Sequence, residues 1–456
     1  FAFLVGGGSR SDIASLPFLR AIAVLAAFWA ATQFTADDWK RIRVPLILLV
    51  LLTAWIALQL VPLPPAVWHT FPGRETIIAI DRVLDQVDVW RPISLTPSET
   101  WNSLLAMSVP FAALLLAAKL DPENYPGLLL AIVGIATVCA LMGFFQYVSG
   151  PGSVAYLYRI TNSDAMVGLF ANRNHNAVFL ACAIAIVAAL LRDERMRRRR
   201  SRPLQTALIF AGLTFTALTV LIGSRAGFVA GAIAFAAGYT MLVFAWNAKL
   251  AGGNGEKGLI RVTGVWRYLI YSPPVLLAVL LGAAIWLSDR TTALSRLADQ
   301  GAGDDIRVQA WPTVWSMIEK YWVTGSGMGS FPDVYQMFEP DALLSPFYFN
   351  HAHNDWAEIL LTGGLPMALI LISAVVWFFL QVRAQGWRNL VKGHRGDLRL
   401  PVLIVIFVLA AVSLVDYPLR VPSFQVMAIM LITLLCCPGA RASAAGLNLR
   451  ASPESL

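Results

Sequence analysis

Long apolar runs recur along the whole chain, and they restrict its fold more than any other feature of the sequence. Most of them approach the roughly 20 residues with which an α-helix crosses the hydrocarbon core of a bilayer. The chain is therefore predicted to be an all-α, polytopic integral membrane protein with about 11–12 transmembrane helices. The expected spans are 16–34, 44–61, 101–118, 128–148, 177–191, 204–222, 226–246, 268–287, 359–380, 400–415 and 421–437.

The composition agrees with a membrane protein. Hydrophobic residues make up 57% of the chain and charged residues 14%, whereas about a quarter of a soluble domain is charged. The net charge of +8 collects in a few short connections, as the positive-inside bias predicts. It is therefore no sign of nucleic-acid binding, and we expect membrane lipids rather than nucleic acid around the protein.

Four basic connections set the expected orientation. When the spans are counted off, residues 40–43, 192–200, 249–267 and 383–399 all fall on one side of the membrane, which is predicted to be the cytoplasmic side. The first residue shown then lies outside. This start fits one further helix upstream and a total of about twelve.

The other side of the membrane receives the longer loops. Residues 1–456 are predicted to form a single transmembrane domain with two segments on the non-cytoplasmic side, at 62–100 and 288–355. The second precedes the third-last span. Because a long loop between two spans is usually functional, we expect 288–355 to carry functional residues.

Two features stand out inside the long loop. Asp304 or Asp305 can cap a helix in which Trp311, Trp315 and Trp322 share one stripe, and such a helix either lies at the membrane interface or packs against neighbouring spans. The glycine-rich turn 325–329 follows. It is either a cradle of backbone N–H groups for a phosphate or an ordinary flexible turn.

Polar and ionisable side chains are concentrated where the long loop meets the span 359–380. Asn354 can cap this helix, which places His353 at the helix N-terminus, where the dipole disfavours an imidazolium. A neutral imidazole is what a general base requires. Asp355 or Glu358 is expected to orient the ring.

A metal site is the alternative interpretation of this junction. His351, His353 and Glu358 could supply ligands, but the two histidines are not spaced as the i, i+4 pair of a zinc helix. The four cysteines show no metal-binding spacing either. No metal and no cofactor is predicted.

Several arginines are expected at the same outer face, where the positive-inside rule disfavours them. Ser224 can cap the helix after Arg225, and an arginine beside a helix N-terminus makes a good anion site. Arg173 starts another span and Arg307 lies in the long loop. Arg420 follows Asp416 between the last two spans, and these two are expected to pair with each other. The outward arginines fit a polyanionic ligand such as a lipid diphosphate.

Several motifs together resemble the O-antigen ligase/O-antigen polymerase superfamily of bacterial envelope enzymes. Their order and placement along most of the chain carry this resemblance, and the features near 62–65 and 92–95 resemble its exopolysaccharide branch. The motifs are His353-Asn354-Asp355-Trp356, Gly363-Gly364-Leu365-Pro366, Gly223-Ser224-Arg225-Ala226-Gly227, Asn172-Arg173-Asn174, Arg307-Val308-Gln309-Ala310-Trp311 and the turn 325–331.

The resemblance implies an inverting glycosyltransferase of the inner (plasma) membrane that acts at the periplasmic face without a metal or a nucleotide sugar. Its donor would be an oligosaccharide on undecaprenyl diphosphate. His353 would be the general base, and Arg225 and Arg307 would hold the diphosphate. Further substrate-binding candidates, from the resemblance and the polar cluster, are Arg173, His351, Asn354, Glu358 and Arg420.

The acceptor is left open by the resemblance. A polymerase would extend a second lipid-linked unit in O-antigen or exopolysaccharide synthesis, and a ligase would modify lipid A–core of the lipopolysaccharide. We favour the polymerase because of the early loop features. A flippase and a chain-length regulator are possible partners. A lipid-linked glycan transporter is the alternative from another class, but its site would lie near the midplane, where the spans hold almost no charges.

Overall fold

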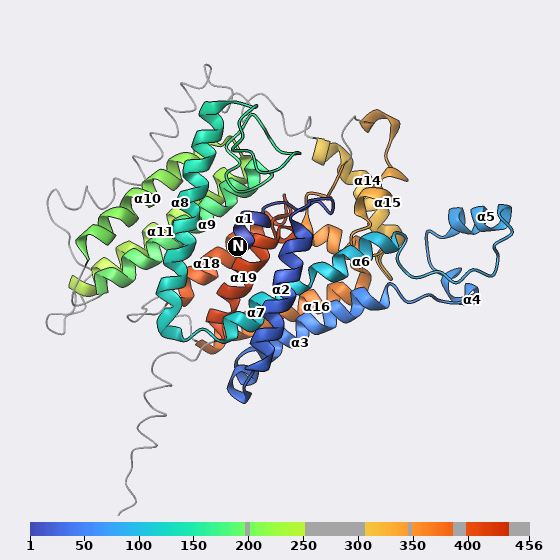
Figure 1. The fold of residues 1–456 in the computed structure, drawn as a ribbon, viewed down its shortest axis with the longest axis horizontal. Coiled ribbons are helices and arrows are strands. Elements are labelled where there is room, and N and C mark those ends of the chain that lie inside the picture. Colours follow the sequence, from blue (N-terminus) through green and yellow to red (C-terminus); the bar gives the residue numbers. More distant parts are fainter. Residues whose placement is uncertain (197–200, 251–305, 345–348, 386–397, 437–456) are drawn as a thin grey trace, which may run out of the picture.

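The computed structural model describes residues 1–196, 201–250, 306–344, 349–385 and 398–436 (Figure 1). In these ranges the regular structure is helical, apart from one isolated bridge between Leu63 and Arg91. The predicted all-α architecture is therefore confirmed. The predicted span 268–287, the connection 251–267, the cap at Asp304 or Asp305 and the first part of the loop 288–355 lie outside the described ranges.

Seven helical stretches in the described ranges are long and apolar enough to cross a membrane. Three shorter apolar helices accompany them, so ten of the predicted spans correspond to observed helices. The long stretches are α3 (Ala36–Leu58), α6 with α7 (Pro97–Ala106 and Ser108–Ala118), α8 (Tyr125–Ser149), α9 (Arg173–Met196), α10 (Arg202–Leu221), α11 (Arg225–Leu250) and α16 (Asp355–Gln385). The shorter helices are α2 (Leu16–Thr32), α18 (Arg399–Val412) and α19 (Pro422–Leu435).

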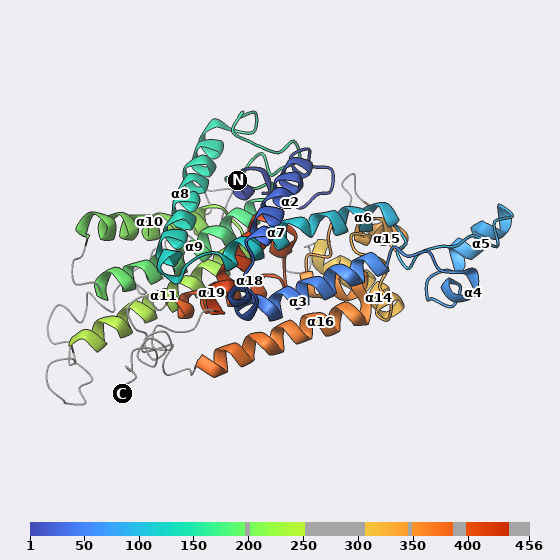
Figure 2. The ribbon, with the colours of Figure 1, turned by 60° about the horizontal axis from the view of Figure 1, so that its bottom comes forward.

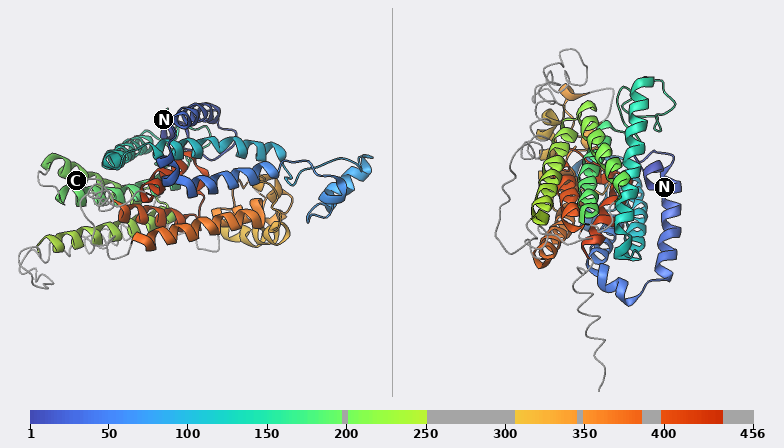
Figure 3. Two further views of the ribbon diagram at one scale, coloured as in Figure 1. Left: turned by 90° about the horizontal axis from the view of Figure 1, so that it is seen from below. Right: turned by 90° about the vertical axis from the view of Figure 1, so that its left-hand side faces the viewer.

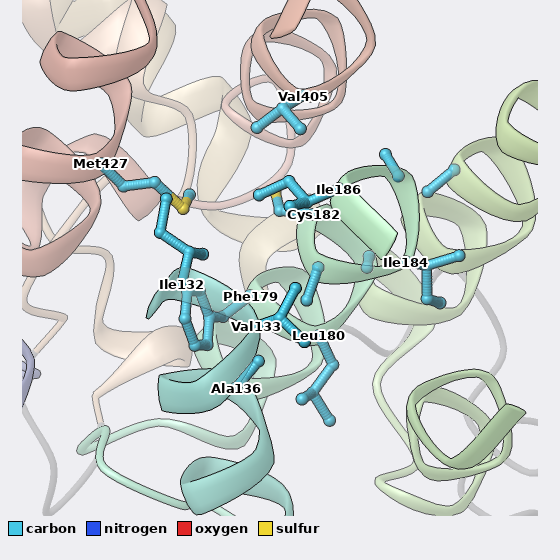
Figure 4. Packing of buried hydrophobic residues seen from close by; sticks show 14 of the residues in the cluster. Ile132, Val133, Ala136, Phe179, Leu180, Cys182, Ile184, Ile186, Val405 and Met427 are labelled. Carbon is cyan, nitrogen blue, oxygen red and sulfur yellow. The ribbon is translucent and has the colours of Figure 1, made fainter. Parts of the chain in front are cut away.

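Helix α9 forms the centre of the bundle. It packs against α8, α10, α11 and α18. In Figure 4, side chains of α9 such as Phe179 and Cys182 meet Ile132 of α8, Val405 of α18 and Met427 of α19. A helix that is apolar on every face is stable only when other helices or lipid surround it. Helix α9 is surrounded by other helices, and small residues such as Ala177 let them approach closely.

A second group of helices, α2, α3, α7, α16 and α19, packs beside this core. Helices α3 and α16 run side by side (Figure 2). The predicted periplasmic segment 62–100 contains the short α4 (Pro65–Trp68) and α5 (Glu75–Val83), which extend away from the bundle (Figures 1 and 3). The molecule is therefore elongated.

Two basic segments differ from the prediction. Residues 40–43 are not a connection but lie inside α3, which begins earlier because Thr35 and Asp38 form a reciprocal capping box. The run 192–200 is predicted to be a connection between spans, yet Arg192, Asp193 and Glu194 are buried within the last turns of α9. Residues 197–200 lie outside the described ranges.

The N-termini of α9, α11, α16 and α19 lie at one end of the bundle, which we call the site end. Helices α9 and α11 run parallel, since a Cβ on Gly227 would meet Ala177 and one on Gly238 would meet Ala188. The first residues of the chain reach the same end. Ser423 N donates to the carbonyl of Gly6 at 3.1 Å.

Candidate active site

The N-terminus of α16 is fixed by a cap and by a neighbouring helix. Asn354 Oδ1 accepts a hydrogen bond from Ala357 N at 3.0 Å, so the predicted cap is confirmed. Asp355 N donates to the carbonyl of Ser413, and Ser413 Oγ donates to Asp355 Oδ2 at 3.0 Å. These bonds tie the start of α16 to the end of α18.

Contacts at a break inside α16 help to hold the N-terminus of the helix in place. Gly364 has φ +65, and Pro366 cannot bond back into the helix. The carbonyl of Thr362 accepts instead from Gln59 Nε2 at 2.9 Å and from Gly327 N at 3.0 Å. The break is thus joined to α3 and to the glycine-rich turn.

The glycine-rich turn 325–329 does not form the phosphate cradle that was one of its two interpretations. The backbone N–H groups of residues 325–328 already bond to protein oxygens, as in Ser326 N to Leu361 O at 3.0 Å. Gly325, Gly327 and Gly329 have positive φ values, and a Cβ on Gly325 would lie 2.3 Å from the carbonyl of Thr362. The glycines therefore allow a close backbone contact with α16.

Helix α14 (Ile306–Tyr321) has a buried side and an exposed side. Val314 and Ile318 are buried, whereas Trp311 and Trp315 of the predicted stripe are exposed. Trp322, just beyond the helix, is exposed too. Exposed tryptophans on a membrane protein favour the interface interpretation of this stripe.

His353 lies just before α16 in an unusual backbone conformation. Its φ is +50, and in the described ranges Asp85 is the other non-glycine residue with a positive φ. The ring packs against Phe349 and Tyr417. Strained backbone of this kind clusters at functional sites.

The partner of His353 is Asp416, not the predicted Asp355 or Glu358. His353 Nδ1 lies 3.4 Å from Asp416 Oδ1, and Asp416 also accepts from Tyr417 N at 3.0 Å. The carboxylate is completely buried. If Nδ1–H faces this carboxylate, Nε2 is the ring nitrogen that can accept a proton.

Burial sets the charge states of this pair. Desolvation lowers the pKa of His353 below 6.5, the charge of Arg307 lowers it further, and Asp416 opposes both. Desolvation alone would raise the pKa of Asp416, but the neighbouring His353 and the positive charge of Arg307 lower it. At neutral pH the pair is an uncharged imidazole beside an ionised carboxylate.

Asp355 and Glu358 belong to a second network. Arg420 Nε lies 3.3 Å from Asp355 Oδ1, and Arg420 Nη2 lies 3.4 Å from Glu358 Oε1. The expected pair of Arg420 with Asp416 is therefore wrong, because Asp416 faces His353. Glu358 also binds His351 Nδ1 at 3.1 Å and the backbone N–H of Ala352 at 2.9 Å.

The other predicted arginines lie at the same site end. Arg307, in the first turn of α14, acts electrostatically on His353 and Asp416. Arg225 is exposed at the start of α11, where Ser224 Oγ accepts from Gly227 N at 3.0 Å, as predicted. Arg173 starts α9.

Sequence reasoning missed two members of the cluster. Asp416 was assigned to Arg420 rather than to the histidine. His175 is buried on α9, with its ring 5.1 Å from that of Tyr417, and its two nitrogens have no hydrogen-bond partner in the described ranges. The sequence signal that points to His175 is its place in the polar run 172–176, directly after the motif Asn172-Arg173-Asn174.

The described ranges hold no group of three or more His, Cys, Asp or Glu side chains that could bind a metal ion. What they do hold is a neutral histidine with a carboxylate behind it and cationic side chains nearby. Such a site can accept a proton and stabilise negative charge on a neighbouring group.

The fold and the site define a polytopic helical membrane protein with a histidine–carboxylate pair at one end of its bundle. Residues 209–372 match the family model described as O-Antigen ligase. This match supports the O-antigen ligase/O-antigen polymerase superfamily that the motifs predicted, and it supports glycosyl transfer of that type as the general activity. A search of the curated proteins found no match. The matched segment includes Arg225, Arg307 and His353.

Proposed function

We propose that the protein transfers a glycan from a lipid diphosphate to an acceptor sugar hydroxyl, and that it polymerises lipid-linked repeat units. The observation that carries this proposal is the His353–Asp416 pair, 3.4 Å apart and under the influence of Arg307. Two of these three residues belong to the segment that matches the family model.

The proposed step is a direct displacement. The acceptor oxygen attacks the anomeric carbon while His353 Nε2 takes its proton. The bond from the anomeric carbon to the diphosphate oxygen breaks, and its electron pair leaves with the diphosphate. Attack opposite the leaving group inverts the anomeric centre. Arg225 and Arg307 stabilise the charge that develops on the leaving diphosphate.

The remaining predicted residues support this step. Asn354 caps α16 and thereby positions His353, while Glu358 fixes His351 and Arg420. We assign Arg173, at the start of α9, to the edge of the active site, where it would contact the glycan. No residue of this set needs a cofactor for the proposed displacement.

We place the reaction at the periplasmic face of a bacterial inner membrane, with undecaprenyl diphosphate as the donor carrier. The family description supports a second candidate, an O-antigen ligase whose acceptor is lipid A–core. Both reactions use the same base and the same cations, so they differ only in the acceptor. A flippase and a chain-length regulator would be partners of the polymerase.

Reconstitution tests the proposal. Purified protein in liposomes receives undecaprenyl-diphosphate-linked repeat units, with and without lipid A–core. We expect a ladder of longer lipid-linked glycans without lipid A–core. A product that forms only with lipid A–core would establish the ligase. Neither product, with donor still bound, would overturn both and favour transport.

Two variants test the base. His353→Ala should abolish transfer and leave donor binding largely intact, because the ring acts on the acceptor hydroxyl. His69→Ala is the matched control, since His69 is exposed at the end of α4, which projects from the bundle (Figure 1). Full activity of His353→Ala would remove His353 from the mechanism.

A further inference from the structure

A cavity of about 440 Å³ runs between α2, α3, α7 and α19 and reaches the network of His351, Glu358 and Arg420. The walls of the cavity are polar at one end and apolar at the other. Polar side chains such as Ser9, Asn102 and Ser103 line the site end, and apolar side chains line the other. The apolar group includes Leu49, Leu52, Ile429 and Ile432.

The cavity reaches deep into the bundle. Its wall on α19 extends from Pro422, at the helix start, to Ile432. At 1.5 Å per residue this is about 15 Å, or roughly half the hydrocarbon thickness of a bilayer. The wall on α3 deepens in the same direction, from Ile56 to Leu49.

Arg20 lies in the wall of this cavity, inside the otherwise apolar helix α2. Its Nη1 donates to Asn102 Oδ1 at 2.6 Å, and no described carboxylate forms an ion pair with it. Arg420, by contrast, is neutralised by Asp355 and Glu358. A charge inside an apolar span is costly and usually marks a ligand path.

The polar end also contains groups suited to a sugar. Glu99 and Ser103 of α6 line it, and His351 faces it from the active site. Glu99 disfavours a purely anionic ligand beside it, but its carboxylate accepts hydrogen bonds from sugar hydroxyls. Arg10 and Arg420 also line the cavity, but both form ion pairs with carboxylates. The cavity therefore offers, in order, a sugar-binding rim, the Arg20 cation and an apolar channel.

We infer that this cavity binds the acceptor, a sugar on a single-chain polyprenyl diphosphate, with the diphosphate at Arg20 and the chain between α3 and α19. The inference rests on the proposed function and adds a second substrate site to it. Arg225 and Arg307, which we assign to the donor, come from α11 and α14 rather than from the cavity walls.

The size of the cavity supports a single chain. About 440 Å³ is in the range of a pocket for one small ligand, whereas lipid A–core carries several acyl chains. A site of this size suits the sugar, the diphosphate and the first isoprene units of one chain.

Photo-crosslinking tests the site without turnover. The probe is farnesyl diphosphate that carries one N-acetylhexosamine and a diazirine on its last isoprene unit. Protein in nanodiscs is titrated with it, irradiated and digested. We expect labelled peptides from α2, α3 and α19, to the same extent in wild type and in His353→Ala.

Two variants locate the probe. Arg20→Met should weaken this labelling about 10-fold or more, because an ionic hydrogen bond to the diphosphate is lost. Ala106→Phe should block it by filling the cavity. Their matched controls, Arg43→Met and Ala21→Phe, change exposed positions outside the cavity and should label like wild type.

The outcomes separate this inference from the proposed function. Labelling confined to α11 and α14, or labelling of α2 and α19 that survives both Arg20→Met and Ala106→Phe in folded protein, would overturn the acceptor site. Loss of transfer in His353→Ala would still support the proposed function in either case.

Discussion

His353 Nδ1 and Asp416 Oδ1 lie 3.4 Å apart, although one residue precedes α16 and the other lies between α18 and α19. The hydrogen bonds of Asp355 to Ser413 bring these two segments together. The hydrogen bonds that fix the start of α16 therefore also place the Asp416 carboxylate next to the His353 imidazole. This arrangement allows the function of each partner to be tested separately.

Asp416→Asn keeps the shape of the side chain and removes its charge. We expect kcat for glycosyl transfer to fall by about 10²–10⁴-fold, the usual contribution of an oriented general base. Asp416 raises the pKa of His353, so the variant should also lose activity at a lower pH than wild type. Asp333→Asn, at an exposed position, is the control. Wild-type activity of Asp416→Asn would show that the carboxylate has no part in the reaction.

The wild-type pH profile follows from the buried imidazole. Because burial lowers the pKa of His353 below 6.5, the base stays neutral as pH falls to about 6.5, the ordinary histidine value. kcat/KM should be constant down to that pH and decline below it. The same depressed pKa contributes stability that is present above about 6.5 and lost as pH falls through the folded value. A decline that begins above pH 7 would contradict a neutral buried base.

Arg307→Gln should move the profile in the opposite direction to Asp416→Asn. The charge of Arg307 lowers the pKa of His353, so its removal raises that pKa and shifts the acid limb to higher pH. We also expect weaker donor binding, measured by titration with the lipid-linked donor. Lys320→Gln, on the last turn of the same helix, should change neither quantity. Unchanged pH dependence together with unchanged donor affinity would remove Arg307 from the site.

The sequence predicted the parts of the fold that depend on local patterns. Each long apolar run became a helix wherever the chain is described, and the caps at Asn354 and Ser224 followed from residues within four positions. The start of α3 was misplaced because the basic residues 40–43 suggested a connection. Thr35 and Asp38 instead cap a helix that includes them.

The candidate site was predicted only where its residues are neighbours in the chain. His353, His351 and Glu358 stand together, and the structure keeps them together. The pairing of His353 with Asp416 depends on how α16 packs on α18 and α19, which no local pattern reveals. Proximity in the chain made Asp416 and Arg420 look like partners, but the turn between them directs the two side chains to different networks.

Glu358→Gln tests the second network. Glu358 is buried and binds His351, Arg420 and the backbone of Ala352. Loss of its charge leaves Arg420 with half of its ionic partners, and breaking a buried ion pair typically costs ~3–5 kcal/mol. We expect a lower free energy of unfolding in detergent. Glu319→Gln, exposed on α14, should cost far less. Equal stability of the two variants would show that the network is not structural.

Gly364→Ala tests whether the break in α16 supports the site. At φ +65 an added Cβ would lie 2.5 Å from Gly325 N and 2.6 Å from Thr324 C, and backbone atoms cannot yield as side chains can. Strain at a positive φ costs about 1–3 kcal/mol, and the clash adds to it. We therefore expect a lower unfolding temperature and reduced transfer, because the start of α16 carries Asn354 and positions His353. Gly134→Ala is the matched control, since nothing lies within 4 Å of its added Cβ and helical alanine is about 1 kcal/mol better than glycine. If Gly364→Ala retained full activity and wild-type stability, the break could not be what holds the active-site end of α16 in place.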